Sequence, residues 1–121
     1  MSTKRFERLV AEALDGLPRE FAEAVENVMV TVEEEPREED LRALGLDPEE
    51  DTLFGLYHGV SLPERGLDYI SLPDRIVIYR RPILEACSSP GEIVDEIRQT
   101  VLHELGHYFG LTEEDMPEEE S

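Results

Sequence analysis

The sequence contains no tryptophan and only one cysteine, Cys87. A single cysteine excludes a disulfide within the chain and fits a reducing compartment, so we expect a cytoplasmic location. The sequence pattern places no activating base near Cys87, and a thiol without such a neighbour is a poor nucleophile at neutral pH. We therefore predict a structural role for this cysteine.

Long hydrophobic segments are also missing. No apolar run approaches the roughly 20 residues that a membrane-spanning helix needs. The first six residues, MSTKRF, have no apolar segment behind them that would mark a secretory signal. The 121 residues, 40% of them hydrophobic, suffice for one hydrophobic core. We expect a single domain spanning residues 1–121, in which residues 112–121 form a partly flexible acidic tail.

Basic residues are scarce: 11 lysines and arginines stand against 30 aspartates and glutamates, which gives a net charge of −19. Such a chain repels the phosphates of nucleic acids and of acidic lipids, so we expect neither a nucleic-acid partner nor a membrane partner. It attracts basic peptides or proteins, although acidity by itself also keeps a small protein soluble. No oligomeric state is indicated by the sequence.

The N-terminal segment has the periodicity of an amphipathic helix. The segment 15–18 ends this helix, and Pro18 opens a second short helix to about Glu26, because proline suits the first helical turn. The apolar residues recur with the spacing of one helical face, at Phe6, Leu9, Val10, Ala13 and Leu14.

Three segments, 28–32, 53–59 and 75–80, have the β-branched and aromatic composition of strands. Glycines in the second segment indicate a bulge or a close approach of the backbone to a neighbour. Together with the helices, the strands predict an α+β fold, with a small mixed sheet packed on a long C-terminal helix plus the N-terminal helix. Smaller predicted elements are a helical turn or two at 38–44, a turn at 63–66 and a short helix at 82–87.

A long C-terminal helix is predicted to begin after Ser89 and to run to Phe109. Ser89 suits the N-terminal cap, with Pro90 at the first position and Glu92 three residues after the cap. Gly110 is the expected left-handed terminator. The core stripe of this helix consists of Ile93, Ile97, Val101, Leu105 and Tyr108.

The end of this helix carries the sequence HELGHYFG, which has the pattern HExxHxxG. On a helix, His103 and His107 project from one face about one turn apart, and this spacing suits two imidazole ligands on one zinc ion. Glu104 lies at the edge of the same face, where it can take a proton from the water that the metal activates. We therefore predict a zinc site with Glu104 as general base; a pair of surface histidines without a metal is the ordinary alternative.

A zinc hydrolase needs a third protein ligand and one open position. Gly110 lets the chain turn back, so a residue just beyond it can reach the metal. Glu113 occupies the third-ligand position of the longer pattern HExxHxxGxxH, and we predict it as the third ligand, with Asp115 as the next candidate. Glu114, His58 or a water molecule stay open as alternatives.

Three tyrosines, Tyr57, Tyr69 and Tyr79, are candidates for stabilising an oxyanion, since a tyrosine hydroxyl can donate to one. Each of them also suits the ordinary place of a half-buried strand tyrosine. The sequence does not choose between these roles.

The chain resembles the small bacterial metallopeptidase-family proteins called minimal zincins, in which HExxH is followed by a short glycine turn and an acidic residue. The resemblance rests on the segments LFGLYHG, RIVIYRRPI and HELGHYFGLTEEDM, and so extends over most of the chain. It implies a zincin-like α+β fold, His103 and His107 as zinc ligands and Glu104 as general base. The chain departs from the pattern at Glu113, where related sequences tend to have aspartate, and Met116 follows too closely to form a Met-turn.

Two functions are compatible with these features. The one we favour is a zinc-dependent metallopeptidase, in which the strand at 53–59 lines a cleft and pairs with an extended peptide. The other is a non-catalytic metal-binding module with a structural or protein-interaction role, because 121 residues leave little chain for substrate subsites. Hydrolysis of peptides by the metal-loaded protein would distinguish them.

Overall fold

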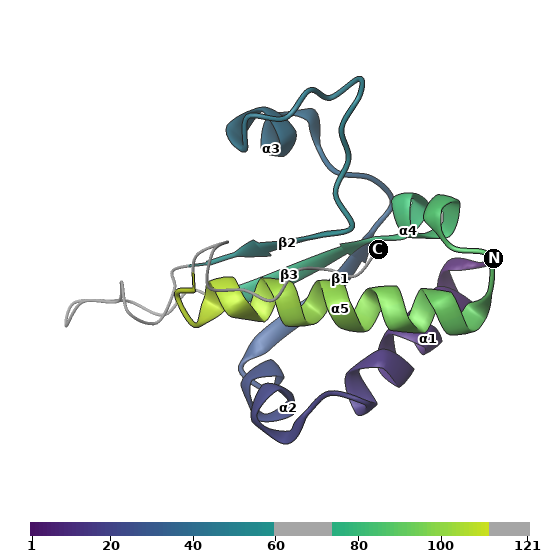
Figure 1. The fold of residues 1–121 in the computed structure, drawn as a ribbon, viewed down its shortest axis with the longest axis vertical. Coiled ribbons are helices and arrows are strands. Elements are labelled where there is room, and N and C mark those ends of the chain that lie inside the picture. Colours follow the sequence, from purple (N-terminus) through teal and green to yellow (C-terminus); the bar gives the residue numbers. More distant parts are fainter. Residues whose placement is uncertain (60–73, 112–121) are drawn as a thin grey trace.

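The computed structural model describes residues 1–59 and 74–111, which form five helices and three strands (Figure 1). The α+β composition predicted from the sequence is thereby confirmed. No helix in the described ranges is long and apolar enough to cross a membrane. In chain order the elements are α1 (Thr3–Asp15), α2 (Arg19–Val25), β1 (Val28–Glu33), α3 (Glu38–Ala43), β2 (Gly55–His58), β3 (Asp74–Tyr79), α4 (Arg80–Ala86) and α5 (Pro90–Tyr108).

The strands form one mixed sheet in the order β1-β3-β2. β1 runs parallel to β3, with Val28 opposite Asp74, and β2 runs antiparallel to β3, with Gly55 opposite Ile78. β3 therefore lies between two strands, which explains why its segment Ile76–Tyr79 is apolar and fully buried. β2 is left at one edge of the sheet.

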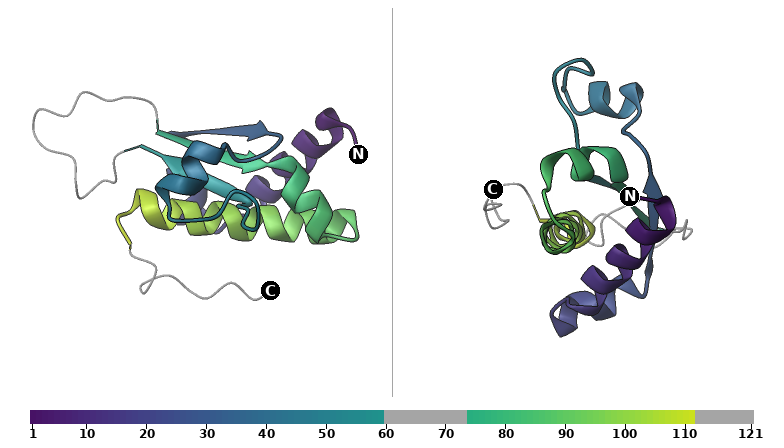
Figure 2. Two further views of the ribbon diagram at one scale, coloured as in Figure 1. Left: turned by 90° about the horizontal axis from the view of Figure 1, so that it is seen from above. Right: turned by 90° about the vertical axis from the view of Figure 1, so that its right-hand side faces the viewer.

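The long helix α5 runs along the sheet (Figure 1), and α1 packs against α5 (Figure 2). Alternate residues of β3 and the predicted stripe of α5 meet in one core, so the hydrophobic face of each element is covered by another. The residues that form this core include Phe6, Leu9, Val10, Ala13, Ile76, Ile78, Ile83, Ile93, Ile97, Val101 and Leu105.

Both ends of α1 are closed by specific contacts. At the first end, the Oγ atom of Ser2 accepts a hydrogen bond from the backbone N–H of Arg5 at 3.2 Å. At the other end, Nε of Arg98 in α5 donates to the carbonyl of Ala13 at 3.2 Å. A β-carbon on Gly16 would lie 2.3 Å from the guanidinium of Arg98, so a larger residue there would displace the arginine side chain from this contact between α1 and α5.

The predicted elements are present, with differences at their ends. α4 begins at Arg80, two residues before Pro82, where the sequence predicts its start. Pro82 fits inside the first turn because the N–H groups there have no partner within the helix. β2 covers Gly55–His58 and is shorter than predicted, and α5 ends at Tyr108, one residue early. The predicted turn at 63–66 and the tail at 112–121 lie outside the described residues.

Candidate metal centre

The motif helix α5 starts as the sequence predicts. The Oγ atom of Ser89 accepts a hydrogen bond from the backbone N–H of Glu92 at 3.2 Å, and the carboxylate of Glu92 accepts one from the N–H of Ser88 at 2.8 Å. Pro90 takes the first helical position. These contacts fix where the helix begins, and therefore which of its residues face the core.

The same helix ends in a left-handed turn at Gly110, whose φ angle is 82°. The N–H of Gly110 donates to the carbonyl of His107, and the N–H of Leu111 donates to the carbonyl of Gly106, both at 2.9 Å. This pair of bonds is the Schellman arrangement, so the terminator predicted at Gly110 is confirmed. The chain thus changes direction directly after the second histidine of the motif.

His103 and His107 project from the same side of α5. Their ring centroids are 5.2 Å apart and their planes are inclined by 80°. The two side chains are 26% and 34% exposed, whereas the neighbouring stripe residues Val101 and Leu105 are fully buried. The imidazoles therefore lie at the border between the core and the solvent.

Glu104 lies between the two histidines in the sequence, but only 5% of it is exposed. Its Oε1 atom accepts a hydrogen bond from the backbone N–H of Tyr57 in β2, at 2.9 Å. Its Oε2 atom lies 3.9 Å from Nε2 of His103 and 4.0 Å from Nε2 of His107. One carboxylate oxygen thus faces the edge strand, and the other faces the imidazole pair.

These three side chains can hold a metal ion. Each offers one ligand atom, and the ligand atoms all lie within 4.8 Å of one another. Imidazole nitrogens and carboxylate oxygens are the donors that Zn²⁺ accepts in proteins. Since the histidines are partly exposed, an ion can reach them from solvent, and the residues present therefore fit the metal that the motif predicts.

The third protein ligand is not placed by the structure. Glu113, Glu114 and Asp115 lie outside the described residues. His58 lies in β2 opposite Arg75, and because side chains alternate along a strand it points to the other face of the sheet from Tyr57. His58 accordingly does not join the group formed by the two motif histidines and Glu104.

The glycine of β2 brings this edge strand close to α5. A β-carbon on Gly55 would lie 2.5 Å from Cγ2 of Thr100 and 3.0 Å from the carbonyl oxygen of Val77. β2 pairs with β3 one residue to one, so the glycine marks a close approach and not a bulge. This resolves the alternative that the sequence left open for the segment 53–59.

The sequence alone did not predict that Tyr57 contacts Glu104. Its hydroxyl donates to Oδ1 of Asp74 at 3.1 Å, and its ring makes an edge contact with Tyr108 at a centroid distance of 6.1 Å. Its backbone N–H reaches Glu104. The glycine at position 55 was the one local signal of this approach, since a backbone hydrogen bond to a distant side chain leaves no trace in sequence spacing.

Tyr79 occupies a different environment from Tyr57. It is 2% exposed, and it follows Ile78, whose side chain points into the core beside α5. Burial raises the pKa of Tyr79 to about 12, and the carboxylates of Asp40 and Glu33 contribute in the same direction. Tyr79 therefore lies on the other face of the sheet from the histidine pair, while Tyr69 lies outside the described residues.

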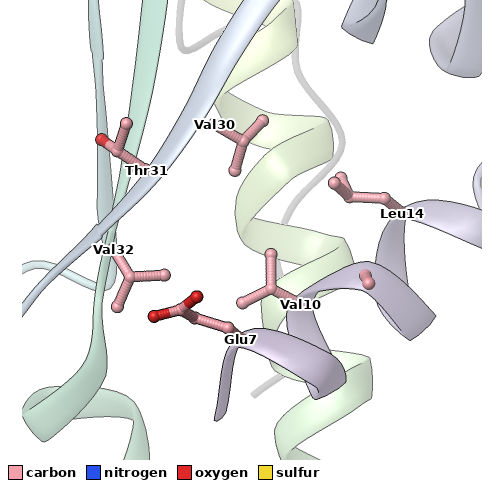
Figure 3. A pocket seen from close by; sticks show the side chains of 7 residues that line it. Glu7, Val10, Leu14, Val30, Thr31 and Val32 are labelled. Atoms are coloured by element: carbon pink, nitrogen blue, oxygen red, sulfur yellow. The ribbon is translucent and has the colours of Figure 1, made fainter. Parts of the chain in front are cut away.

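An apolar groove of about 400 Å³ lies between α1 and β1, away from the histidine pair (Figure 3). Val30 and Val32 of β1 point toward Val10 and Leu14 of α1, and Glu7 is the one charged side chain among the described residues that line it. A catalytic site needs several convergent polar groups, which this groove lacks. It is therefore not the candidate active site.

Cys87 is partly buried. Burial raises the pKa of its thiol, and the carboxylates of Glu96 and Glu92 add to this effect. The thiolate, which is the nucleophilic form, is thereby disfavoured. The structural role predicted for Cys87 is supported.

A family model described as zincin-like metallopeptidase matches residues 25–121, a range that contains the whole sheet and the HExxH helix. The chain belongs to the zincin-like metallopeptidase family. The resemblance to small zincin-like proteins, inferred from the sequence motifs, is thus confirmed. Membership implies a metal ion, and the described residues of this zincin-like protein include a His–Glu–His group that could hold one.

Comparison with solved structures finds the same overall fold over nearly the whole chain. A conserved hypothetical protein from Thermus thermophilus is similar, with 22% sequence identity and a TM-score of 0.58. The match covers 90% of this chain and 94% of the other. At this identity the likeness concerns the fold alone. No curated protein matches the chain.

Proposed function

We propose that this zincin-like protein is a zinc-dependent metallopeptidase that hydrolyses peptide bonds with Glu104 as its general base. One observation carries the proposal: Oε2 of Glu104 lies 3.9 Å and 4.0 Å from the Nε2 atoms of His103 and His107. A carboxylate oxygen in this position adjoins the place of an ion held by both imidazoles. The family match supports a peptide as substrate.

His103 and His107 would hold the metal, and we propose Glu113 as the third ligand, with Asp115 as the alternative. Glu113 follows the Schellman turn at Gly110, which redirects the chain after the helix. When bound, zinc would lower the pKa of a water molecule toward about 7 and polarise the carbonyl group that the water attacks. Two imidazoles and one carboxylate are a common ligand set for zinc in this role.

Although the carboxylate of Glu104 lies within 4.8 Å of the ligand atoms of both histidines, in this proposal it acts on protons and does not hold the metal. Its Oε1 atom accepts a hydrogen bond from the N–H of Tyr57, and its Oε2 atom faces the imidazole pair. Oε2 accepts a proton from the attacking water and passes it to the leaving amine. Because the side chain of Glu104 is only 7% exposed, bulk water competes little for this oxygen.

The substrate is proposed to be an extended peptide with basic character. β2 pairs with β3 on one side, and its other side is turned toward α5 near the histidine pair. An extended peptide can lie along such an edge and present its carbonyl groups to the site. The net charge of −19 favours a basic peptide or a basic segment of a protein.

We further propose that residues 1–121 act as one zincin-like domain in the cytoplasm. The family match begins at residue 25, after α1. However, Phe6 and Leu9 of α1 belong to the same core as Leu105, which lies inside the HExxH motif. This shared core supports one domain that includes the N-terminal helix. The cytoplasmic location is proposed because a single cysteine fits a reducing compartment.

Metal analysis combined with a peptide-library digest tests the proposal. Protein purified without chelator should contain about one zinc per chain, as expected for one site of this ligand type. The zinc-loaded protein should cleave peptides, the chelator-treated protein should not, and added zinc should restore cleavage. A non-catalytic metal-binding module predicts bound zinc without cleavage of any peptide in a broad library, and that result would reject the peptidase.

A further inference from the structure

We propose that Tyr57 is a positioning residue: it holds the carboxylate of Glu104 so that Oε2 faces the histidine pair. The inference rests on the proposed function, because it concerns the general base of that reaction. It goes beyond that function in assigning a task to the edge strand β2 that is separate from binding a substrate.

The direction of the Tyr57 N–H follows from the strand register. Hydrogen-bonded pairs alternate along an antiparallel ladder, and the N–H of Tyr79 donates to the carbonyl of Phe54 at 2.9 Å. The next hydrogen-bonded pair therefore contains Leu56. Tyr57 belongs to the non-hydrogen-bonded pair that follows, so its N–H is turned away from β3. There it donates to Oε1 of Glu104 at 2.9 Å.

The side chain of Tyr57 anchors this part of the strand. Its hydroxyl donates to Oδ1 of Asp74 at the start of β3, at 3.1 Å, and its ring meets the ring of Tyr108 at an angle of 80°. Asp74 and Tyr108 are both buried, and Tyr108 directly follows the ligand candidate His107. A strand of only four residues at the edge of a sheet is thus tied to both β3 and α5 at one residue.

The hydrogen bond from Tyr57 fixes the orientation of the Glu104 carboxylate. A buried carboxylate needs a donor, so the bond to Oε1 selects one rotamer of the side chain. In that rotamer Oε2 is nearly equidistant from the two imidazoles, at 3.9 Å and 4.0 Å. A displacement of about 1 Å at a catalytic group can lower the rate by about 100-fold, so this support matters for catalysis.

Hydrogen exchange tests the contact without any assay of activity. In the wild type the amide of Tyr57 should be protected, and Glu104→Gln should keep the protection because its amide oxygen still accepts the bond. Glu104→Ala should raise exchange at Tyr57 by about tenfold, while the amide of Leu56 in the same strand stays within about twofold. Equal exchange at Tyr57 in the Gln and Ala variants would overturn the proposal.

Steady-state kinetics tests the consequence. Tyr57→Phe removes the bond to Asp74, and should lower kcat by about tenfold while KM and zinc affinity stay within about twofold. Tyr79→Phe removes a hydroxyl from the neighbouring strand, on the other face, and serves as the matched control with unchanged kcat. An unchanged kcat in Tyr57→Phe would overturn the proposal. If the wild type cleaves no peptide, the proposed function fails, and the exchange experiment still decides whether Tyr57 holds Glu104.

Discussion

Gly55 and Thr100 touch so closely that a β-carbon on the glycine would lie 2.5 Å from the methyl group of the threonine. Two residues further along β2 is Tyr57, and four residues further along α5 is Glu104. Two residues of a strand and four residues of a helix both advance about 6–7 Å. The contact at Gly55 therefore sets the alignment of β2 and α5 that brings the N–H of Tyr57 to the carboxylate of Glu104.

Gly55→Ala is expected to destabilise the protein by about 1–3 kcal/mol, because the added methyl group forces β2 away from α5. The neighbouring carbonyl of Val77, at 3.0 Å, blocks the other direction. Urea unfolding measures the change. Gly91→Ala is the matched control, since the nearest atom to its β-carbon is Oγ of Ser89 at 3.9 Å. A loss of stability that is equal in both variants would contradict the close contact.

The raised pKa of Tyr79 should make the protein less stable at alkaline pH. Its pKa is about 12 in the folded state, against about 10 in an unfolded chain. Below pH 10 both states keep the proton and this group does not affect stability. Between pH 10 and pH 12 the unfolded state releases the proton first, so the free energy of unfolding should fall by roughly 2–3 kcal/mol in total.

Tyr79→Phe removes this titration, so its free energy of unfolding should fall less steeply over the same interval. Denaturant unfolding at a series of pH values measures both slopes. Parallel curves for the wild type and Tyr79→Phe above pH 10 would show that the raised pKa of Tyr79 is wrong.

The affinity for zinc should depend on both motif histidines. His103→Ala and His107→Ala should each abolish tight zinc binding, because each removes one of the two imidazole donors. His58→Ala should retain the metal, since His58 does not join the group. Competition with a chromophoric chelator measures the affinity. Stoichiometric zinc in the double variant at positions 103 and 107 would reject the site.

Two carboxylates beyond the helix are candidates for the third metal ligand. Glu113→Ala should weaken zinc binding by about 10-fold or more, because it removes a direct ligand, whereas Asp115→Ala should change it little. The same chelator competition applies. The opposite ranking would assign the ligand to Asp115, and the absence of an effect from either would exclude both.

The sequence predicts the motif helix well because its signals are local. Ser89 and Gly110 mark the two ends of α5 through hydrogen bonds that span only three to five residues. The spacing of His103 and His107 places both on one helical face, and the structure brings their ligand atoms together with that of Glu104. Periodicity likewise identifies α1, whose predicted face contributes buried residues to the core.

What the sequence could not predict depends on contacts between distant segments. Tyr57 and Glu104 are 47 positions apart, and their hydrogen bond follows from the alignment of β2 with α5. The parallel pairing of β1 with β3 and the contact of Arg98 with Ala13 are of the same kind. Such relationships arise from packing of whole elements, so composition and spacing within one segment do not encode them visibly.

The most direct test of the account is the rate of peptide hydrolysis by zinc-loaded wild type and zinc-loaded Glu104→Gln, measured side by side on one peptide library. Glutamine is nearly isosteric with glutamate but cannot take the proton of the attacking water. We expect equal zinc content in both proteins and a rate of hydrolysis that is lower by about 100-fold to 10,000-fold in the variant. Hydrolysis at equal rates in both would contradict the assignment of Glu104 as the general base.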